Sequence, residues 1–132
     1  MVSRGIAAAL ITVWAFSGQA QQGDAKKEVM AVVENSIKLI TEKKYAELIK
    51  TYIWPAEVER LTARFGSLDN AAAEMAKGDG MATVLKALQT AAKLEPAFER
   101  DGTVARFRFD APIGRDSGLK LEHLKGRWYL RD

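Results

Sequence analysis

The chain contains one histidine, His123, and no cysteine, which narrows the chemistry that its side chains can perform. Histidine changes charge near neutral pH, so His123 is a candidate general acid or base, with Tyr52 as a candidate partner. A nucleophile for the pair is missing, because the sequence holds no G-x-S-x-G motif. The alternative is that His123 is a partly exposed residue near the end of a strand, and we favour it.

Metal and cofactor chemistry find little support in the sequence. A single histidine and no cysteine argue against a zinc site. Gly78-Asp79-Gly80 lacks the preceding strand and the following G-K-[ST] of a phosphate loop. Glu57 and Glu59 fall at the start of a helix, where carboxylates complement the helix dipole. We therefore expect no metal, no cofactor and, as the leading interpretation, no catalysis.

Aromatic residues are better candidates for ligand binding. Tyr52 and Trp54 lie at a break between two predicted helices, and each carries a polar atom that needs a partner when buried. Together with Phe107 and His123 they form our predicted ligand-binding set, suited to a small apolar ligand. The alternative is that these side chains simply belong to the hydrophobic core.

A second candidate site comes from alternating cations in the last third of the chain. Successive residues of a strand point to opposite faces of a sheet. That alternation places five cations on one face, away from Ala105, Phe107 and Phe109: Arg106, Arg108, Lys120, Arg127 and Arg131. We interpret this face as a site for an anionic protein partner, and its alternative is a solvated surface. The formal net charge of +3 is too small to indicate nucleic-acid binding.

Helices must position the first of these candidates. Apolar residues recur at helical spacing, which predicts five helices over residues 25–40, 45–52, 55–65, 70–77 and 81–92. Asp24 and Asp69 are expected to cap the first and the fourth helix. Trp54-Pro55 separates the second helix from the third, because the residue before a proline avoids the helical conformation. Gly66 is expected to end the third helix.

Strands must position the remaining candidates. The apolar period changes to two after residue 93, which predicts strands over 94–100, 103–110, 119–124 and 127–131. Asp101-Gly102 is the strongest hairpin signal and Lys125-Gly126 is a second one. Residues 111–118, with Pro112, are expected to form a longer connection. The fold class is α+β, with N-terminal helices packed on one face of a curved four-stranded antiparallel sheet.

The first twenty residues read as a secretory signal peptide. Arg4 precedes an uncharged apolar run over residues 6–16, and Gly18 and Ala20 fit the positions before a cleavage site. We expect cleavage after Ala20, a single domain over residues 21–132, and a periplasmic or secreted product. Because no cysteine stands at the cleavage point, we expect no lipid anchor. Because the apolar run is too short to span a bilayer, we also expect no stable membrane insertion. We expect a monomer, since five like charges on the open sheet face oppose a symmetric dimer.

The order of these elements resembles that of the small exported bacterial proteins of the NTF2-like (cystatin-like) superfamily. The resemblance runs from about Lys26 to Asp132 and is carried by EKKYAELIKTY around Tyr45, by the helix that opens at Pro55, and by KGRWYL at the end of the chain. It implies helices folded against a curved sheet to form a cone with an internal pocket. Members include isomerases, hydrolases and plain binding modules, so the family implies no single chemistry.

Three functions follow as expectations. The first is an exported non-catalytic module that binds a small apolar ligand or an envelope protein. The second is a small cone-type isomerase or hydrolase that uses His123 and Tyr52. The third is a periplasmic inhibitor or immunity-type protein that acts through the basic sheet face.

Overall fold

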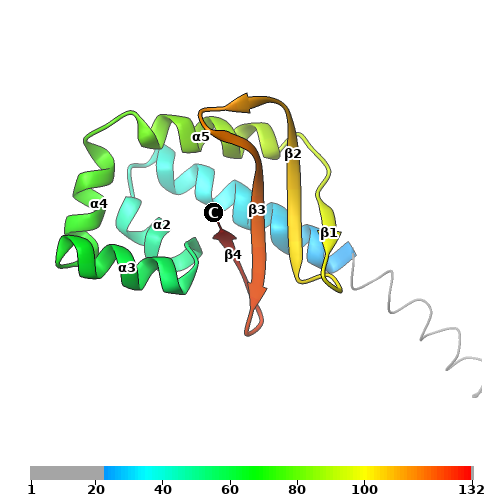
Figure 1. Ribbon diagram of the computed structural model, residues 1–132, viewed down its shortest axis with the longest axis horizontal. Helices are drawn as coiled ribbons and strands as arrows, with labels where there is room; N and C mark the ends of the chain where they lie inside the picture. The colour runs from blue at the N-terminus through cyan, green and yellow to red at the C-terminus, as the bar shows by residue number, and fades with distance from the viewer. Residues whose placement is uncertain (1–22, 132) are drawn as a thin grey trace, which may run out of the picture.

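A computed structural model describes residues 23–131 and shows an α+β fold, with helices packed against one antiparallel sheet (Figure 1). A helix over residues 23–41 comes first. Four helices follow it: Tyr45–Tyr52 (α2), Pro55–Phe65 (α3), Leu68–Ala76 (α4) and Gly80–Ala91 (α5). The strands are Ala97–Glu99 (β1), Val104–Ile113 (β2), Asp116–Leu124 (β3) and Arg127–Arg131 (β4), in the spatial order β1-β2-β3-β4. The predicted fold class and strand order are therefore confirmed, whereas the signal-peptide prediction lies outside the described residues.

The helix over residues 23–41 crosses the sheet and forms the centre of the hydrophobic core. Val29 and Val33 are fully buried on this helix, and Phe107 and Leu121 are fully buried on the sheet. Burying apolar area stabilises a fold by about 25 cal/mol per Å². The Trp128 indole reaches the same helix, where its Nε1 donates a hydrogen bond to Glu28 at 3.1 Å. One sheet face is thus covered by helices, as the alternation of side chains predicts.

The break between α2 and α3 is held against the edge of the sheet. Ile53 forms a parallel bridge with Leu130, and the Trp54 backbone N–H donates to the Leu130 carbonyl at 3.1 Å. Pro55 occupies the first turn of α3, where its missing N–H costs nothing. Gly66 ends α3 with a φ of +89°, a conformation that glycine adopts without strain. Both predicted helix boundaries are confirmed.

Two predicted helix caps are wrong. Residue 24 already lies within the first helix, so Asp24 is not its cap. The cap of α4 is Ser67, whose Oγ accepts a hydrogen bond from the Asn70 N–H at 3.1 Å, and Asp69 lies in the first turn. The Ser67 hydroxyl satisfies one of the free N–H groups at the start of the helix, and the Asp69 carboxylate in the first turn complements the helix dipole.

The hairpin turns differ from prediction in one case and agree in the other. Between β1 and β2, Arg100 and Asp101 have φ values of 52° and 58°, and the Gly102 N–H donates to the Glu99 carbonyl at 3.1 Å. The turn is therefore centred one residue before the predicted Asp101-Gly102. Lys125-Gly126 connects β3 to β4 directly, with Leu124 paired to Arg127 and positive φ at both turn residues, as predicted.

Strands β2 and β3 are longer than predicted. Ile113 pairs with Asp116 across a turn at residues 114–115, so residues 111–118 are mostly strand and not a connection. The pairing is irregular between Arg108 and Ile113, which is where Pro112 falls. Proline is tolerated at such a bulge because no ladder hydrogen bond is required of it. Strand β1, by contrast, is shorter than the predicted residues 94–100.

Within residues 23–131, every helix is too short or too polar to cross a membrane.

Candidate functional site beside strand β3

Strand β3 has two halves with different neighbours. Its second half, Lys120 to Leu124, pairs with β4 on one side, and most of it also pairs with β2 on the other. Its first half, residues 116–119, has a strand partner on the β2 side alone, counting only the described residues, because β4 ends at Arg131 opposite Lys120. This first half of β3 lies beside the space between α3 and α5 in Figure 1.

That space is a partly open hollow of about 1130 Å³. Its inner wall is apolar and comes from α3, α4, α5 and the core face of the sheet, including Leu61, Met75, Val84, Ala87, Leu88, Phe107, Phe109 and Leu119. Six cations also line it: Arg60, Arg106, Arg108, Arg115, Lys120 and Arg131. Both kinds of side chain reach one hollow because it opens at a strand edge, where the two sheet faces meet.

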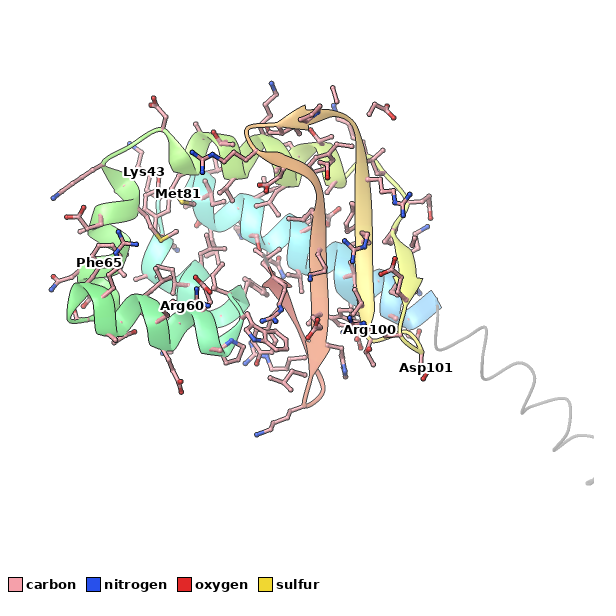
Figure 2. The ribbon with its side chains drawn as sticks, viewed as in Figure 1. Lys43, Arg60, Phe65, Met81, Arg100 and Asp101 are labelled. Atoms are coloured by element: carbon pink, nitrogen blue, oxygen red, sulfur yellow. The ribbon has the colours of Figure 1, made fainter. Side chains whose placement is uncertain are left out.

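Three acidic residues offset part of this charge. Glu57 pairs with Arg60 on α3 at 2.8 Å, and Glu99 pairs with Arg106 across β1 and β2 at 3.2 Å. Asp116 is the third acid of the lining and has no ion pair within residues 23–131. The lining therefore keeps an excess of positive charge, and Figure 2 shows Arg60 directed from α3 toward this space.

Three of the lining cations lack a close acidic partner. Arg108, Arg115 and Lys120 form no ion pair in the part of the chain that the structure describes. Arg131 approaches Glu122 at 3.9 Å, at the long end of an ion-pair contact. Surface charges without local partners remain available to an anionic ligand.

Trp54 and Arg131 form a contact at the end of β4. The Arg131 guanidinium lies over the Trp54 ring at 4.4 Å, which is a cation–π geometry. The same ring meets Tyr129 edge-on at 6.1 Å, and Arg127 lies over Tyr129 at 5.6 Å. Arg127 also donates to the Thr51 carbonyl at 3.3 Å. The cation–π contact thus holds the Arg131 guanidinium beside Trp54, and both residues line the hollow.

The structure divides the predicted ligand-binding set into two pairs. Trp54 and Phe107 line the hollow, whereas Tyr52 and His123 are not among its lining residues. Tyr52 packs against the hydrophobic core, and the His123 ring meets Trp128 edge-on at 5.2 Å. Within residues 23–131 no hydrogen bond joins the Tyr52 and His123 side chains. The catalytic pair therefore stays a prediction that no contact favours.

The predicted basic face is built largely as the alternation indicates. The strand register aligns Arg106, Lys120 and Arg131 in one row across β2, β3 and β4, and Arg108 lies opposite Gly118. These four line the hollow, whereas Arg127 lies at the other end of β4, beside the turn to β3. No group of histidine and carboxylate side chains within residues 23–131 is arranged to hold a metal ion.

Sequence reasoning missed Arg60 and Arg115. The sequence predicts a connecting segment around Arg115, and nothing in the local spacing indicates that the turn at residues 114–115 lies beside the hollow. Arg60 reaches the hollow from α3, and α3 comes near the sheet only in the folded chain. The local sequence therefore does not indicate that Arg60 lines the hollow. The sequence around a charged residue on an exposed helix face does not indicate which surface of the folded protein that residue will face.

Comparison with known proteins adds no relative: no family model, curated protein or solved structure matches the chain.

Proposed function

We propose that the protein is an exported, non-catalytic binding module of the NTF2-like type and that the hollow beside β3 is its site. The observation that carries the proposal is an apolar inner wall next to lining cations that lack acidic partners. A ligand with an apolar body and a negative charge complements both parts. Helices that cover one sheet face and leave a hollow at its edge also support the NTF2-like interpretation.

Each part of the site contributes in a different way. Apolar contact with Val84, Leu61 and Leu119 removes hydrocarbon from water and supplies affinity. The cations attract the charged end of the ligand and fix its orientation, and this contribution decreases with added salt. A polar group buried without a partner is costly, so the charged end should stay near the mouth of the hollow.

Dodecanoate is a suitable first probe, and dodecyltrimethylammonium is its control with the same tail and the opposite charge. We expect calorimetry below the micelle concentration of each to show saturable binding of dodecanoate and little binding of the cation. Amide chemical shifts should move at Val84 and Leu119. Equal binding of the two amphiphiles, or no binding of either, would contradict the proposal.

A pair of variants on α5 locates the binding. Val84 lines the hollow and is 37% exposed, so Val84→Glu places a charge against the apolar wall without emptying the core. Ala82 is exposed on the same helix and does not line the hollow, which makes Ala82→Glu the control. Dodecanoate should bind Val84→Glu at least about tenfold more weakly, a change of about 1.4 kcal/mol, and bind Ala82→Glu normally. The same affinity in both variants would place the site elsewhere.

A second candidate is a periplasmic inhibitor or immunity-type protein that binds an anionic partner through the basic sheet face. It is favoured by Arg108 and Lys120, which have no ion pair within the described residues. A pull-down from envelope extract would identify the partner. Arg106→Glu combined with Arg108→Glu should abolish that complex without unfolding the domain, and unchanged capture would reject this candidate.

A further inference from the structure

Three cations that line the hollow stand directly opposite one another across the sheet. The strand register pairs Lys120 of β3 with Arg106 of β2 on one side and with Arg131 of β4 on the other. We call these three residues the basic row. Paired residues of neighbouring strands point to the same face of the sheet, and the strands lie about 4.8 Å apart. Like charges at such positions destabilise a sheet, so a bound anion would relieve the repulsion within the basic row.

Nearby acids neutralise the two ends of the basic row and leave its centre. Arg106 pairs with Glu99 at 3.2 Å, and Arg131 approaches Glu122 at 3.9 Å. Lys120 forms no ion pair within residues 23–131. The positive charge of the row that has no local counter-charge is therefore centred on Lys120.

Two arginines extend this charge along the hollow. Arg108 lies two residues beyond Arg106 on β2, and Arg115 lies in the turn between β2 and β3. Both line the hollow and lack an ion pair in the described part of the chain. The lining contains six cations and three acids, which leaves an excess of three positive charges. A single carboxylate offsets one of them, whereas a phosphomonoester carries about −1.5 to −2 at pH 7.

We infer that the ligand of the hollow is a single-chain amphiphile whose charged end is a phosphomonoester, held by the basic row and Arg108. The inference rests on the proposed function, since it names the ligand class for the same site. Arginine presents a planar fork of N–H donors that matches two phosphate oxygens, and lysine supplies a compact point charge. A lysine between two arginines therefore suits a tetrahedral group with three charged acceptor oxygens better than a planar carboxylate with two.

The apolar wall and the basic row meet at neighbouring residues of β3. Leu119 belongs to the apolar wall and Lys120 to the row, and both line the hollow. One amphiphile can therefore contact both. At the end of the row, Trp54 holds the Arg131 guanidinium at 4.4 Å from its ring. A side chain that is already placed loses less conformational entropy when the ligand binds.

The test compares decyl phosphate with decyl sulfate by calorimetry, below the micelle concentration of each, with circular dichroism to verify that the protein stays folded. The two ligands share a tail and a tetrahedral head group, but only the phosphate gains a second negative charge, with a pKa of about 6. Between about pH 5 and about pH 8 the affinity for decyl phosphate should rise at least about fivefold, because its attraction to the cations increases. The affinity for decyl sulfate should change less than about twofold, and it reports any effect of protein titration, including that of His123.

Two lysine variants locate the head group. Lys120 is the centre of the basic row, whereas Lys86 is exposed on α5 and does not line the hollow. Lys120→Gln should weaken decyl phosphate binding about tenfold at about pH 8 and reduce its gain with pH, and Lys86→Gln should change neither. Arg108→Gln, at an exposed position, provides the same test if Lys120→Gln does not fold. An unchanged gain with pH in the folded variants would overturn the inference.

The outcomes distinguish this inference from the proposed function. If dodecanoate binds and the affinity for decyl phosphate does not rise with pH, the phosphomonoester is wrong and the binding hollow stands. Inorganic phosphate is the probe for a free anion, and it should bind at least about tenfold more weakly than decyl phosphate, because it lacks the apolar tail. Equal affinity of the two would show that the apolar wall is not used and would overturn both proposals. Both also fail if no amphiphile binds.

Discussion

The two halves of β3 differ in what surrounds them. From Lys120 to Leu124 the strand has β4 on one side and β2 along most of the other, and Leu121 at its centre is fully buried. From residue 116 to 119 it has β2 alone within the described chain, and Leu119 is half-buried at the wall of the hollow. The same strand thus contributes to the core with one half and to the wall of the hollow with the other.

Leu121→Ala should produce the largest loss of stability, because Leu121 is completely buried in the core, on the sheet face that the helices cover. Removing a buried leucine side chain typically costs about 2–5 kcal/mol, through lost burial and the cavity left behind. Urea denaturation measures the free energy of unfolding. A loss below about 1 kcal/mol would show that the paired half of β3 is not part of a well-packed core.

Gly118→Ala should have the next largest effect. A Cβ at this position would lie 2.2 Å from the Phe107 carbonyl oxygen of β2, so the two strands must separate. Crowding of this kind costs about 1–3 kcal/mol. Gly80 is the control, since a Cβ there meets nothing within 4 Å, and Gly80→Ala should leave the unfolding free energy nearly unchanged. Equal stability of the two variants would mean that β2 and β3 are not so close at Gly118.

Leu119→Ala should have the smallest effect on stability and a larger effect on binding. Because the side chain is half-buried, its removal should cost about 1 kcal/mol of unfolding free energy, well below the cost at Leu121. Dodecanoate affinity, measured by calorimetry, should fall severalfold, since Leu119 belongs to the apolar wall. A stability loss as large as that of Leu121→Ala would remove the distinction between the two halves of the strand.

Much of this arrangement follows from local sequence. Helical spacing and Pro55 set the boundaries of α2 and α3, and Lys125-Gly126 sets the β3–β4 turn. Alternation also separates Phe107 from the arginines beside it. These features depend on neighbouring residues, so a single sequence carries their signal.

The hollow itself depends on contacts between distant segments. Its wall includes the part of β3 that continues back to Asp116, beyond the last residue of β4 that the structure describes, and the irregular pairing after Arg108 lies in this part. Neither the unequal strand lengths nor the approach of Arg60 on α3 is encoded by local spacing. Sequence reasoning therefore placed the basic residues on the correct sheet face and missed the hollow that four of them line.

Amide hydrogen exchange at two positions of β3 tests the contrast most directly. The Glu122 N–H faces β4, and we predict that it exchanges slowly, near the rate set by global unfolding. Gly118 lines the hollow, in the half of β3 that has β2 alone as a strand partner within the described residues, and we predict that its N–H exchanges much faster in the free protein and more slowly when dodecanoate is added. Equal protection of the Gly118 and Glu122 amides in the free protein would contradict the account.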